Sequence, residues 1–519
     1  MYKILDMRYK IDYIPRMVRT EAFRRRFHAR WTGTCVAVLL ASGWTIGSGA
    51  AATTVREAAH GSAIGGPTGS QNLDWHALAG IWQGTLSVPG LTVTLVVKMS
   101  VNENGTPQGT IDIPEQEGWN IPAENFVFVD RRLQFDVKAM SRRFEGRLTD
   151  DRRSIEGMWL RGAGLGTIPV TLTKVDRAPE LRRPQAVHPP YPYRETLVTY
   201  TNPVVQISIA GTLTVPPGAG RFPAVLLISG SGAQDRDETI AGHKPFLVLA
   251  DDLTRRGIAV LRVDDRGAGS TGGSHLDSTL DDLVRDVLCG LDFLRTRPEI
   301  DPNKIGLLGH SEGGAIAFLA AAGSDAVAFV VAIGAPGISV EENLYLQGDL
   351  IRRSEQRSEA AIALARAQQQ RIFAIVKGAE NAEAMRRDLR LLFSAGRYDA
   401  MDAAQKEAVD RRIAHLVTPY FGSILTFDPR PVLPRIHCPV LAVAGEKDMQ
   451  APPRENLAAI EAGLLKGGNT RHVVSELKGL NHLLQTAPTG SPNDYSTIEE
   501  TMARSALETI GGWIVKVVR

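Results

Sequence analysis

Five apolar runs constrain the fold of this chain most. Each run is continuous rather than alternating, and each ends in glycine or polar residues. In chain order they are Ala224–Ile228, Ala259–Val263, Ile305–Leu308, Phe329–Ile333 and Val440–Ala444. Continuous apolar strands are typical of parallel sheets, which are buried on both faces. Helical segments such as Asp281–Arg295 lie between the runs. This alternation predicts an α/β fold with a doubly wound, mostly parallel sheet.

One of these strands leads into a short glycine motif. The run Gly309-His-Ser311-Glu312-Gly313 follows Ile305–Leu308 and precedes an alanine-rich segment. A Gly-x-Ser-x-Gly sequence between a strand and a helix is typical of a nucleophile elbow. The turn places serine at the helix N-terminus, where the helix dipole and a backbone N–H stabilise an oxyanion. We therefore predict Ser311 as the nucleophile and the N–H of Glu312 as one oxyanion donor.

An elbow of this kind is followed along the chain by an acid and then by a histidine. Asp448 comes directly after the strand Val440–Ala444, and His482 follows the short strand His472–Leu477. We predict that His482 accepts the serine proton and that Asp448 orients its imidazole. Glu446 is the alternative acid, and Asp448 is favoured because it lies further along the loop.

The second oxyanion donor is expected in the loop after an early strand. This loop is Ser-Gly-Ser231-Gly232-Ala233, and we predict the N–H of Ser231, with Gly232 and Ala233 as alternatives. The charged segment 234–238 follows, and we expect it to brace the loop through buried ion pairs. The alternative is a solvated polar loop. The expected partners of segment 234–238 in these ion pairs are Asp264, Asp265 and Arg266.

The N-terminal segment has the order of an export signal. Residues up to Arg30 are rich in arginine and lysine, 31–47 are uncharged, and 48–52 are small. A membrane span needs about 20 apolar residues, so this run is short for one. We predict cleavage after Ala50 or Ala52 and a periplasmic or secreted product with no stable membrane insertion. Arg24-Arg-Arg-Phe resembles the twin-arginine pattern. General export and an uncleaved anchor are the alternatives.

Composition changes divide the rest of the chain. Residues 74–176 contain short alternating strands, which predict a small antiparallel β barrel or sandwich. Its tryptophans Trp82, Trp119 and Trp159 are expected in the core. Alanine, arginine and glutamate at helical spacing predict a helical cap over about 341–427, above the carboxyl ends of the strands. The predicted units are an export signal (1–52), a linker (53–73), the β domain (74–176), a linker (177–190) and the α/β domain (191–519).

Charge and cysteine content exclude several classes of protein. The formal net charge of +2 over 519 residues implies no strong attraction to nucleic acid or to an anionic membrane. Cys35 lies in the export segment, and the other two cysteines, Cys289 and Cys438, are far apart. This spacing forms neither a disulfide framework nor a metal site. We expect two free thiols, with one long-range disulfide as the alternative, and no metal or organic cofactor.

Together these motifs resemble a bacterial branch of the α/β-hydrolases that includes serine aminopeptidase-like and acyl-thioesterase-like enzymes. The resemblance covers about residues 191–519. It rests on Ser-Gly-Ser-Gly-x-Gln-Asp-Arg-Asp-Glu, Asp-Asp-Arg-Gly-x-Gly-Ser, Gly-His-Ser-Glu-Gly-Gly, Gly-Glu-Lys-Asp and Asn-His. It implies the triad Ser311, Asp448 and His482 and esterase-type chemistry on a small-molecule acyl substrate. One departure is Ser229, where many relatives carry histidine.

The expected activity is hydrolysis of a carboxylic ester through an acyl-enzyme. A peptidase or amidase, and a thioesterase, use the same triad and are the enzymatic alternatives. A non-catalytic binding protein on a hydrolase scaffold is the alternative of another class.

Overall fold

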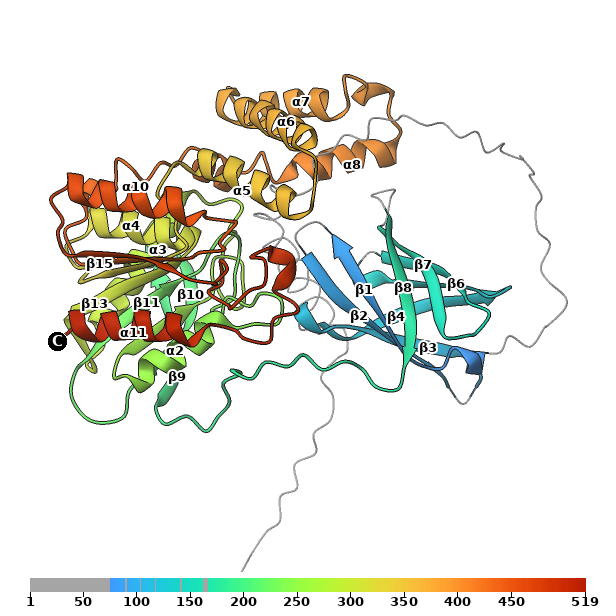
Figure 1. Ribbon diagram of the computed structural model, residues 1–519, viewed down its shortest axis with the longest axis horizontal. Helices are drawn as coiled ribbons and strands as arrows, with labels where there is room; N and C mark the ends of the chain where they lie inside the picture. The colour runs from blue at the N-terminus through green and yellow to red at the C-terminus, as the bar shows by residue number, and fades with distance from the viewer. Residues whose placement is uncertain (1–74, 89–90, 103, 117, 141, 162–166) are drawn as a thin grey trace, which may run out of the picture.

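The computed structural model describes residues 75–519 apart from 89–90, 103, 117, 141 and 162–166 (Figure 1). The predicted export signal and the linker 53–73 lie outside the described residues. Within the described part of the chain, no helix has both the length and the apolar character needed to cross a membrane. Cys289 and Cys438 are free thiols, as expected.

Eight antiparallel strands form a closed barrel at the N-terminal end of the described chain. The barrel closes because β1 pairs with both β2 and β8. The all-β domain is thus confirmed, as a barrel rather than a sandwich. The strands are β1 (Gly80–Val88), β2 (Leu91–Val101), β3 (Pro107–Ile113), β4 (Gly118–Val129), β5 (Arg132–Val137), β6 (Arg142–Leu148), β7 (Ser154–Arg161) and β8 (Thr167–Val175).

The barrel interior is filled by large side chains. Trp82, Phe135 and Trp159 are fully buried, and the indole N–H of Trp82 donates to the carbonyl oxygen of Leu78 at 2.8 Å. The prediction for Trp119 is wrong, because its side chain is 51% exposed. At that end of β4 the neighbouring Gly118 and Ile121 are the buried positions, so the indole lies on the outer surface.

The second domain is built on an eight-stranded sheet in the order β16-β15-β14-β13-β11-β12-β10-β9. Strands β11 to β16 run parallel to one another, whereas β10 is antiparallel to both β9 and β12. The predicted α/β-hydrolase fold is confirmed. The strands are β9 (Arg194–Asn202), β10 (Ile207–Val215), β11 (Phe222–Ile228), β12 (Ala259–Val263), β13 (Ile300–His310), β14 (Val330–Ile333), β15 (Val440–Gly445) and β16 (His472–Leu477).

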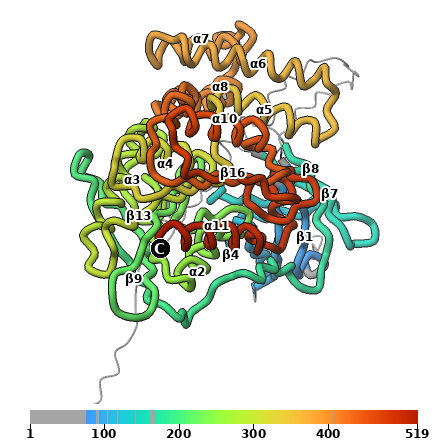
Figure 2. The backbone as a smooth tube through the Cα atoms, turned by 60° about the vertical axis from the view of Figure 1, so that its left-hand side comes forward, coloured from blue at the N-terminus to red at the C-terminus, as the bar shows by residue number. Residues whose placement is uncertain are grey.

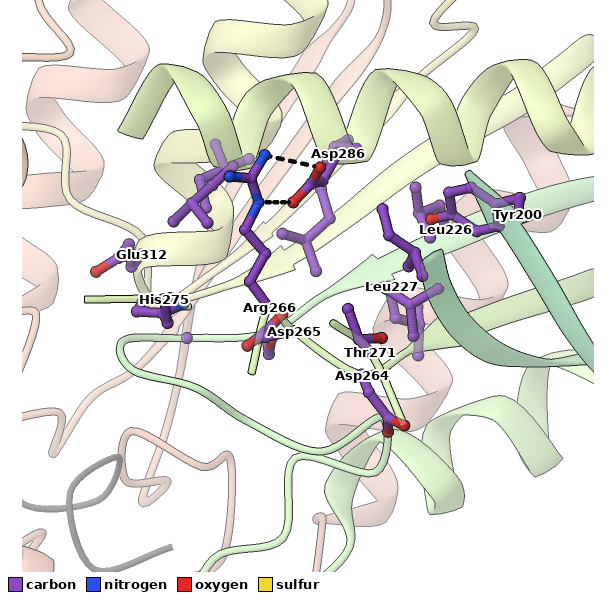
Figure 3. A pocket seen from close by; sticks show the side chains of 18 residues that line it. Tyr200, Leu226, Leu227, Asp264, Asp265, Arg266, Thr271, His275, Asp286 and Glu312 are labelled. Atoms are coloured by element: carbon purple, nitrogen blue, oxygen red, sulfur yellow. Dashed lines mark hydrogen bonds and ion pairs between the residues drawn. The ribbon is translucent and has the colours of Figure 1, made fainter. Parts of the chain in front are cut away.

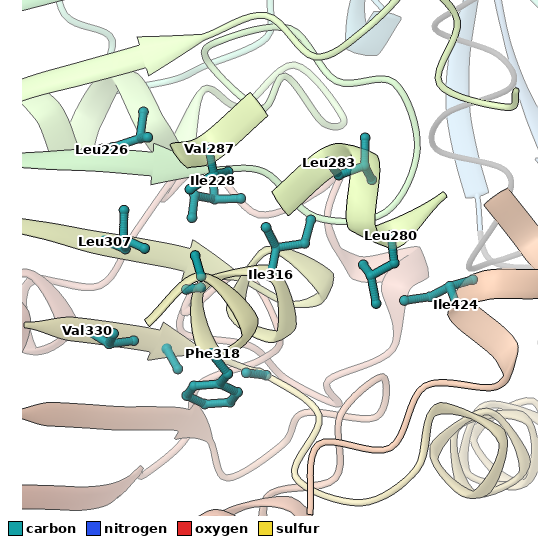
Figure 4. Packing of buried hydrophobic residues seen from close by; sticks show 14 of the residues in the cluster. Leu226, Ile228, Leu280, Leu283, Val287, Leu307, Ile316, Phe318, Val330 and Ile424 are labelled. Carbon is teal, nitrogen blue, oxygen red and sulfur yellow. The ribbon is translucent and has the colours of Figure 1, made fainter. Parts of the chain in front are cut away.

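Helices cover both faces of this sheet (Figures 1 and 2). Successive strand residues point to opposite faces, and both faces are apolar. Leu226 and Leu307 therefore belong to one buried cluster, and Val225 and Val331 to the other. Figure 4 shows the first cluster, where sheet residues meet Phe318. The covering helices are α3 (Leu280–Arg295), α4 (Glu312–Gly323) and α10 (Pro453–Lys466) on one face, and α2 (Pro245–Arg255) and α11 (Arg504–Val517) on the other.

A helical cap is inserted between β14 and β15, as expected, and Figure 1 shows helices α5 to α8 above the sheet domain. Several of its helices begin at a side chain that caps the backbone. Ser339, Ser358 and Asn381 each accept a bond from a backbone N–H in the first turn. The cap helices are α5 (Val340–Ser354), α6 (Glu359–Gly378), α7 (Ala382–Phe393), α8 (Ala403–Ala414) and α9 (Pro419–Leu425).

Candidate active site

Ser311 lies in a strained turn between β13 and α4. Its backbone angles are φ 54° and ψ −120°, and its N–H donates to the carbonyl oxygen of Ile333 at 2.8 Å. The glycines on either side are required by close backbone contacts. A Cβ atom at Gly309 would lie 2.0 Å from the carbonyl oxygen of Gly313, and one at Gly313 would lie 2.1 Å from that of Ile228. This is the geometry of a nucleophile elbow.

Asp448 and His482 form a buried pair at the carboxyl ends of the strands. Asp448 follows β15 and His482 follows β16, and Nδ1 of His482 is bonded to Oδ2 of Asp448 at 2.7 Å. The other carboxylate oxygen accepts the N–H groups of Gln450 and Ala451, both at 2.8 Å. Because the carboxylate engages Nδ1, Nε2 is the ring nitrogen left for proton transfer.

The alternative acid has a different setting. Glu446 is exposed, and its carboxylate accepts the backbone N–H of Gly479 at 2.8 Å. The structure therefore brings His482 to Asp448 and leaves Glu446 in the supporting loop.

Gly334, after β14, joins the elbow to this pair. Its φ is +53°, and a Cβ atom there would lie 3.0 Å from both Oδ2 of Asp448 and Nδ1 of His482. The preceding residue, Ile333, accepts the backbone N–H of Ser311. The end of one short strand thus contacts both parts of the candidate site.

A cavity of about 70 Å³ lies between the elbow and the cap. Ser231, Ser311, Glu312 and Gly334 line its floor. Both predicted oxyanion donors therefore border the same cavity as the predicted nucleophile. The apolar part of the lining comes mainly from the cap and includes Val340, Leu344, Phe421 and Ile424.

A hydrogen-bond network that sequence reasoning did not find connects the loops around Ser311. The carboxylate of Glu238 accepts the N–H of Gly230 at 2.7 Å and is bonded to Nδ1 of His310 at 2.9 Å. The other ring nitrogen, Nε2 of His310, is bonded to the carbonyl oxygen of His482 at 3.1 Å. The one available signal was a histidine inside the elbow motif together with an acidic run after the oxyanion loop.

The partners of His310 also affect its pKa. Burial lowers the pKa of His310, but Glu238 and the His482 carbonyl oxygen outweigh burial, so the pKa lies above its usual value. The hydrogen bonds of this buried pair connect the oxyanion loop to the His482 loop.

The bracing expected of segment 234–238 is present. Arg236 forms an ion pair with Asp264 at 2.7 Å. Asp265 accepts the hydroxyl of Ser229 at 2.7 Å and the N–H of Gln234 at 3.0 Å. Burial raises the pKa of Asp265 well above its usual value, and these two hydrogen bonds oppose the rise.

One expected partner does not take part in this bracing. Arg266 is paired with Asp286 on α3 instead (Figure 3). The cavity in that view, of about 40 Å³, is lined by Gly230 and Asp265 but not by Ser311. It therefore lies behind the oxyanion loop rather than at the candidate nucleophile.

Comparisons with known proteins agree with this fold. The family model described as serine aminopeptidase, S33, matches residues 244–419. Esterase EstD of Thermotoga maritima is 37% identical over 109 residues, which cover 20% of this chain and 25% of EstD. The Bacillus subtilis protein YtaP is 29% identical over 128 residues, covering 22% of this chain and 43% of YtaP. The chain thus matches less than half the length of these two relatives.

Solved structures are more distant in sequence. The α/β hydrolase GrgF from Penicillium is 17% identical, with a TM-score of 0.39, over 63% of this chain and 98% of GrgF. Protein PA2218 from Pseudomonas aeruginosa is 15% identical, with a TM-score of 0.42, over 66% of this chain and 99% of that protein.

Proposed function

We propose that this chain hydrolyses carboxylic esters through an acyl-enzyme on Ser311. Its similarity to the serine aminopeptidase, S33, family model and to esterase EstD supports a hydrolase. One observation carries the proposal. A buried Asp448–His482 pair, bonded at 2.7 Å, lies beside a strained elbow whose serine lines a cavity. Strain at a non-glycine residue costs about 1–3 kcal/mol and is concentrated at functional sites.

Acylation follows from the roles of the three side chains. Nε2 of His482 takes the proton of Ser311 as Oγ attacks the carbonyl carbon of the ester. The resulting oxyanion accepts the backbone N–H groups of Glu312 and Ser231. As the intermediate collapses, the imidazolium gives its proton to the alkoxide, and the alcohol leaves. Asp448 holds Nδ1–H and stabilises the imidazolium.

Deacylation repeats these steps with water. His482 removes a proton from the attacking water, and the hydroxide adds to the acyl carbon. The second intermediate expels Oγ of Ser311, which recovers its proton from the imidazolium. The products are the alcohol and the acid, and the enzyme returns to its starting state.

Hydrolysis of amides is the second candidate function. Glu312 supplies the one carboxyl group of the cavity lining, and the lining contains no lysine or arginine. A substrate ammonium group would favour the ionised form of Glu312, whose pKa burial raises to about 7. The serine aminopeptidase description of the matching family model favours the same substrates.

The cavity supports a preference for short acyl groups. Its volume of about 70 Å³ is far below the roughly 300–1,000 Å³ that is typical of pockets for drug-sized ligands. We therefore expect p-nitrophenyl acetate and butyrate to be hydrolysed faster than the octanoate or laurate.

The test measures kcat and KM of the mature chain on this ester series, beside Ser311→Ala. Loss of the nucleophile is expected to lower kcat by about 10⁴–10⁶-fold. Active folded wild type with an equally active Ser311→Ala would disprove the acyl-enzyme. Turnover of aminoacyl p-nitroanilides without turnover of any ester would favour the amidase function.

We also propose that the chain is exported. In segment 1–52 a basic region is followed by an uncharged apolar region and then by small residues, which is the arrangement of an export signal. The N-terminal sequence of protein from a periplasmic extract checks this. It is expected to begin at Ala51 or Thr53.

A further inference from the structure

Tyr420 is a cap residue that is held rigidly against the α/β domain. It is fully buried, and its ring lies against the imidazole of His275, with 4.4 Å between ring centroids. Its backbone N–H donates to the carbonyl oxygen of Leu276 at 3.3 Å. One turn later, Ser423 accepts the N–H of Leu280 at 2.9 Å. Helix α9 is thus docked on the loop that leads into α3.

Apolar packing supports the same docking. Figure 4 shows Ile424 of α9 beside Leu280 at the start of α3. Both residues are buried and belong to the main hydrophobic cluster of the α/β domain. These contacts fix helix α9, and with it Tyr420, on the α/β domain.

The hydroxyl of Tyr420 contacts both loops of the proposed oxyanion hole. It donates to Oε2 of Glu312, the residue that follows the nucleophile. Ser231 of the oxyanion loop lines the same cavity as Tyr420 and Glu312. Burial raises the pKa of the Tyr420 hydroxyl, and the nearby Ser231 and the backbone of Gly232 oppose that rise. The hydroxyl of this cap residue therefore lies between the elbow and the oxyanion loop.

Glu312 needs this partner because it has few others. Its side chain is buried, and among the described residues Oε1 has no hydrogen-bond partner and no cation forms an ion pair with the carboxyl group. The Tyr420 hydroxyl donates to Oε2, and the hydroxyls of Tyr420 and Ser231 oppose the rise in the pKa of Glu312 that burial causes. Without the tyrosine hydroxyl, the buried carboxyl would lose its closest donor and the two loops would lose their shared contact.

We propose that Tyr420 is a positioning residue through which the docked cap sets the geometry of the oxyanion hole. The inference rests on the proposed function. Oxyanion donors act only within a narrow range of distance, and a displacement of about 1 Å can cost about 10²-fold in rate. The cap therefore contributes to catalysis as well as to the walls of the cavity.

The test compares Tyr420→Phe with wild type in two assays. One is hydrolysis of the preferred ester, and the other is the rate of labelling by a fluorophosphonate probe. The probe phosphonylates Oγ of Ser311: His482 takes the hydroxyl proton, the P–F bond breaks with release of fluoride, and the phosphoryl oxygen occupies the oxyanion hole, whatever the natural substrate is. We expect kcat per folded molecule and the labelling rate to fall by about 10–100-fold, with KM within about threefold and a native circular dichroism spectrum. Tyr345→Phe is the matched control, because Tyr345 donates to a cap glutamate, Glu341, outside the cavity lining.

Two results would overturn the inference. One is a kcat and a labelling rate of Tyr420→Phe within twofold of wild type. The other is a lower melting temperature with unchanged kcat per folded molecule. If Tyr420→Phe does not fold, Glu312→Leu removes the acceptor and keeps the tyrosine. It is expected to label at least about fivefold more slowly, and an unchanged rate contradicts the inference.

Failure of the proposed function gives a different result. A wild-type protein that is labelled at Ser311 but turns over no ester would disprove the esterase function, while the labelling rates would still test Tyr420. Absence of labelling at Ser311 would overturn both.

Discussion

Asp448 and Glu446 lie two residues apart in one loop, yet only Asp448 contacts the histidine. Asp448→Asn should lower kcat by about 10³–10⁴-fold, because an amide no longer holds the Nδ1–H tautomer. Steady-state hydrolysis of p-nitrophenyl butyrate measures the loss. Glu446→Gln is the control and should stay within about twofold, because its amide oxygen still accepts the Gly479 N–H. A larger loss from Glu446→Gln would reverse the assignment.

Glu312 makes stability depend on pH. Burial raises its pKa from 4.5 to about 7, while the Tyr420 and Ser231 hydroxyls lower it. The folded state therefore favours the protonated carboxyl. The contribution of Glu312 to the free energy of unfolding is fully present below about pH 4.5 and is lost as the pH rises through about 7. The loss is on the order of 3 kcal/mol. Glu312→Gln should remove this loss, so its melting temperature relative to wild type should rise from pH 5 to pH 8. A pH-independent difference would contradict the argument.

At the scale of elements, the short strand β14 brings the parts of the site together. Gly334→Ala would place a methyl group about 3.0 Å from both Asp448 and His482, at a φ of +53°. We expect kcat to fall by about 10²-fold or more with a native circular dichroism spectrum. Gly323→Ala, at the end of α4, has no neighbour within 4 Å of the added carbon and should behave as wild type. Full activity of Gly334→Ala would show that Asp448 and His482 can shift without a loss of catalytic activity.

At the scale of the whole molecule, the segment between the barrel and the sheet is bound along the α/β domain. The half-buried side chain of Arg183 donates to the carbonyl oxygens of Ala241, Ser496 and Ile498 at 2.8, 3.3 and 3.2 Å. These acceptors lie in loops that are far apart in sequence. One side chain thus connects the inter-domain segment to two loops of the α/β domain.

Arg183→Ala should lower the free energy of unfolding by about 2–4 kcal/mol, since it leaves these carbonyl groups unpaired. Thermal and urea unfolding measure the change. Arg182→Ala is the control, because its side chain is 76% exposed and its pair with Glu499 is at the surface. The control should change stability by less than about 1 kcal/mol. Equal effects of the two variants would show that the bonds of Arg183 do not contribute.

Much of the fold was predictable because burial leaves a local pattern. Strands buried on both faces are continuously apolar, as in Val440–Ala444, and barrel strands alternate, as in Leu133–Val137. Trp119 shows the limit of this reasoning, because its large ring could not by itself indicate which face of β4 is buried. The choice between barrel and sandwich depended on the pairing of β1 with β8, which is a long-range contact.

The sequence by itself determined the elbow, since the spacing of Gly309, Ser311 and Gly313 is a local steric requirement, and it indicated the loops that carry Asp448 and His482. Only the tertiary structure decided which side chains meet across those loops. Glu238 reaches His310, 72 residues away, and Tyr420 reaches Glu312, 108 residues away. A hydrogen bond between distant polar residues has no period and no fixed spacing. Its partners are chosen by how the cap and the loops pack, and that packing exists only in the folded chain.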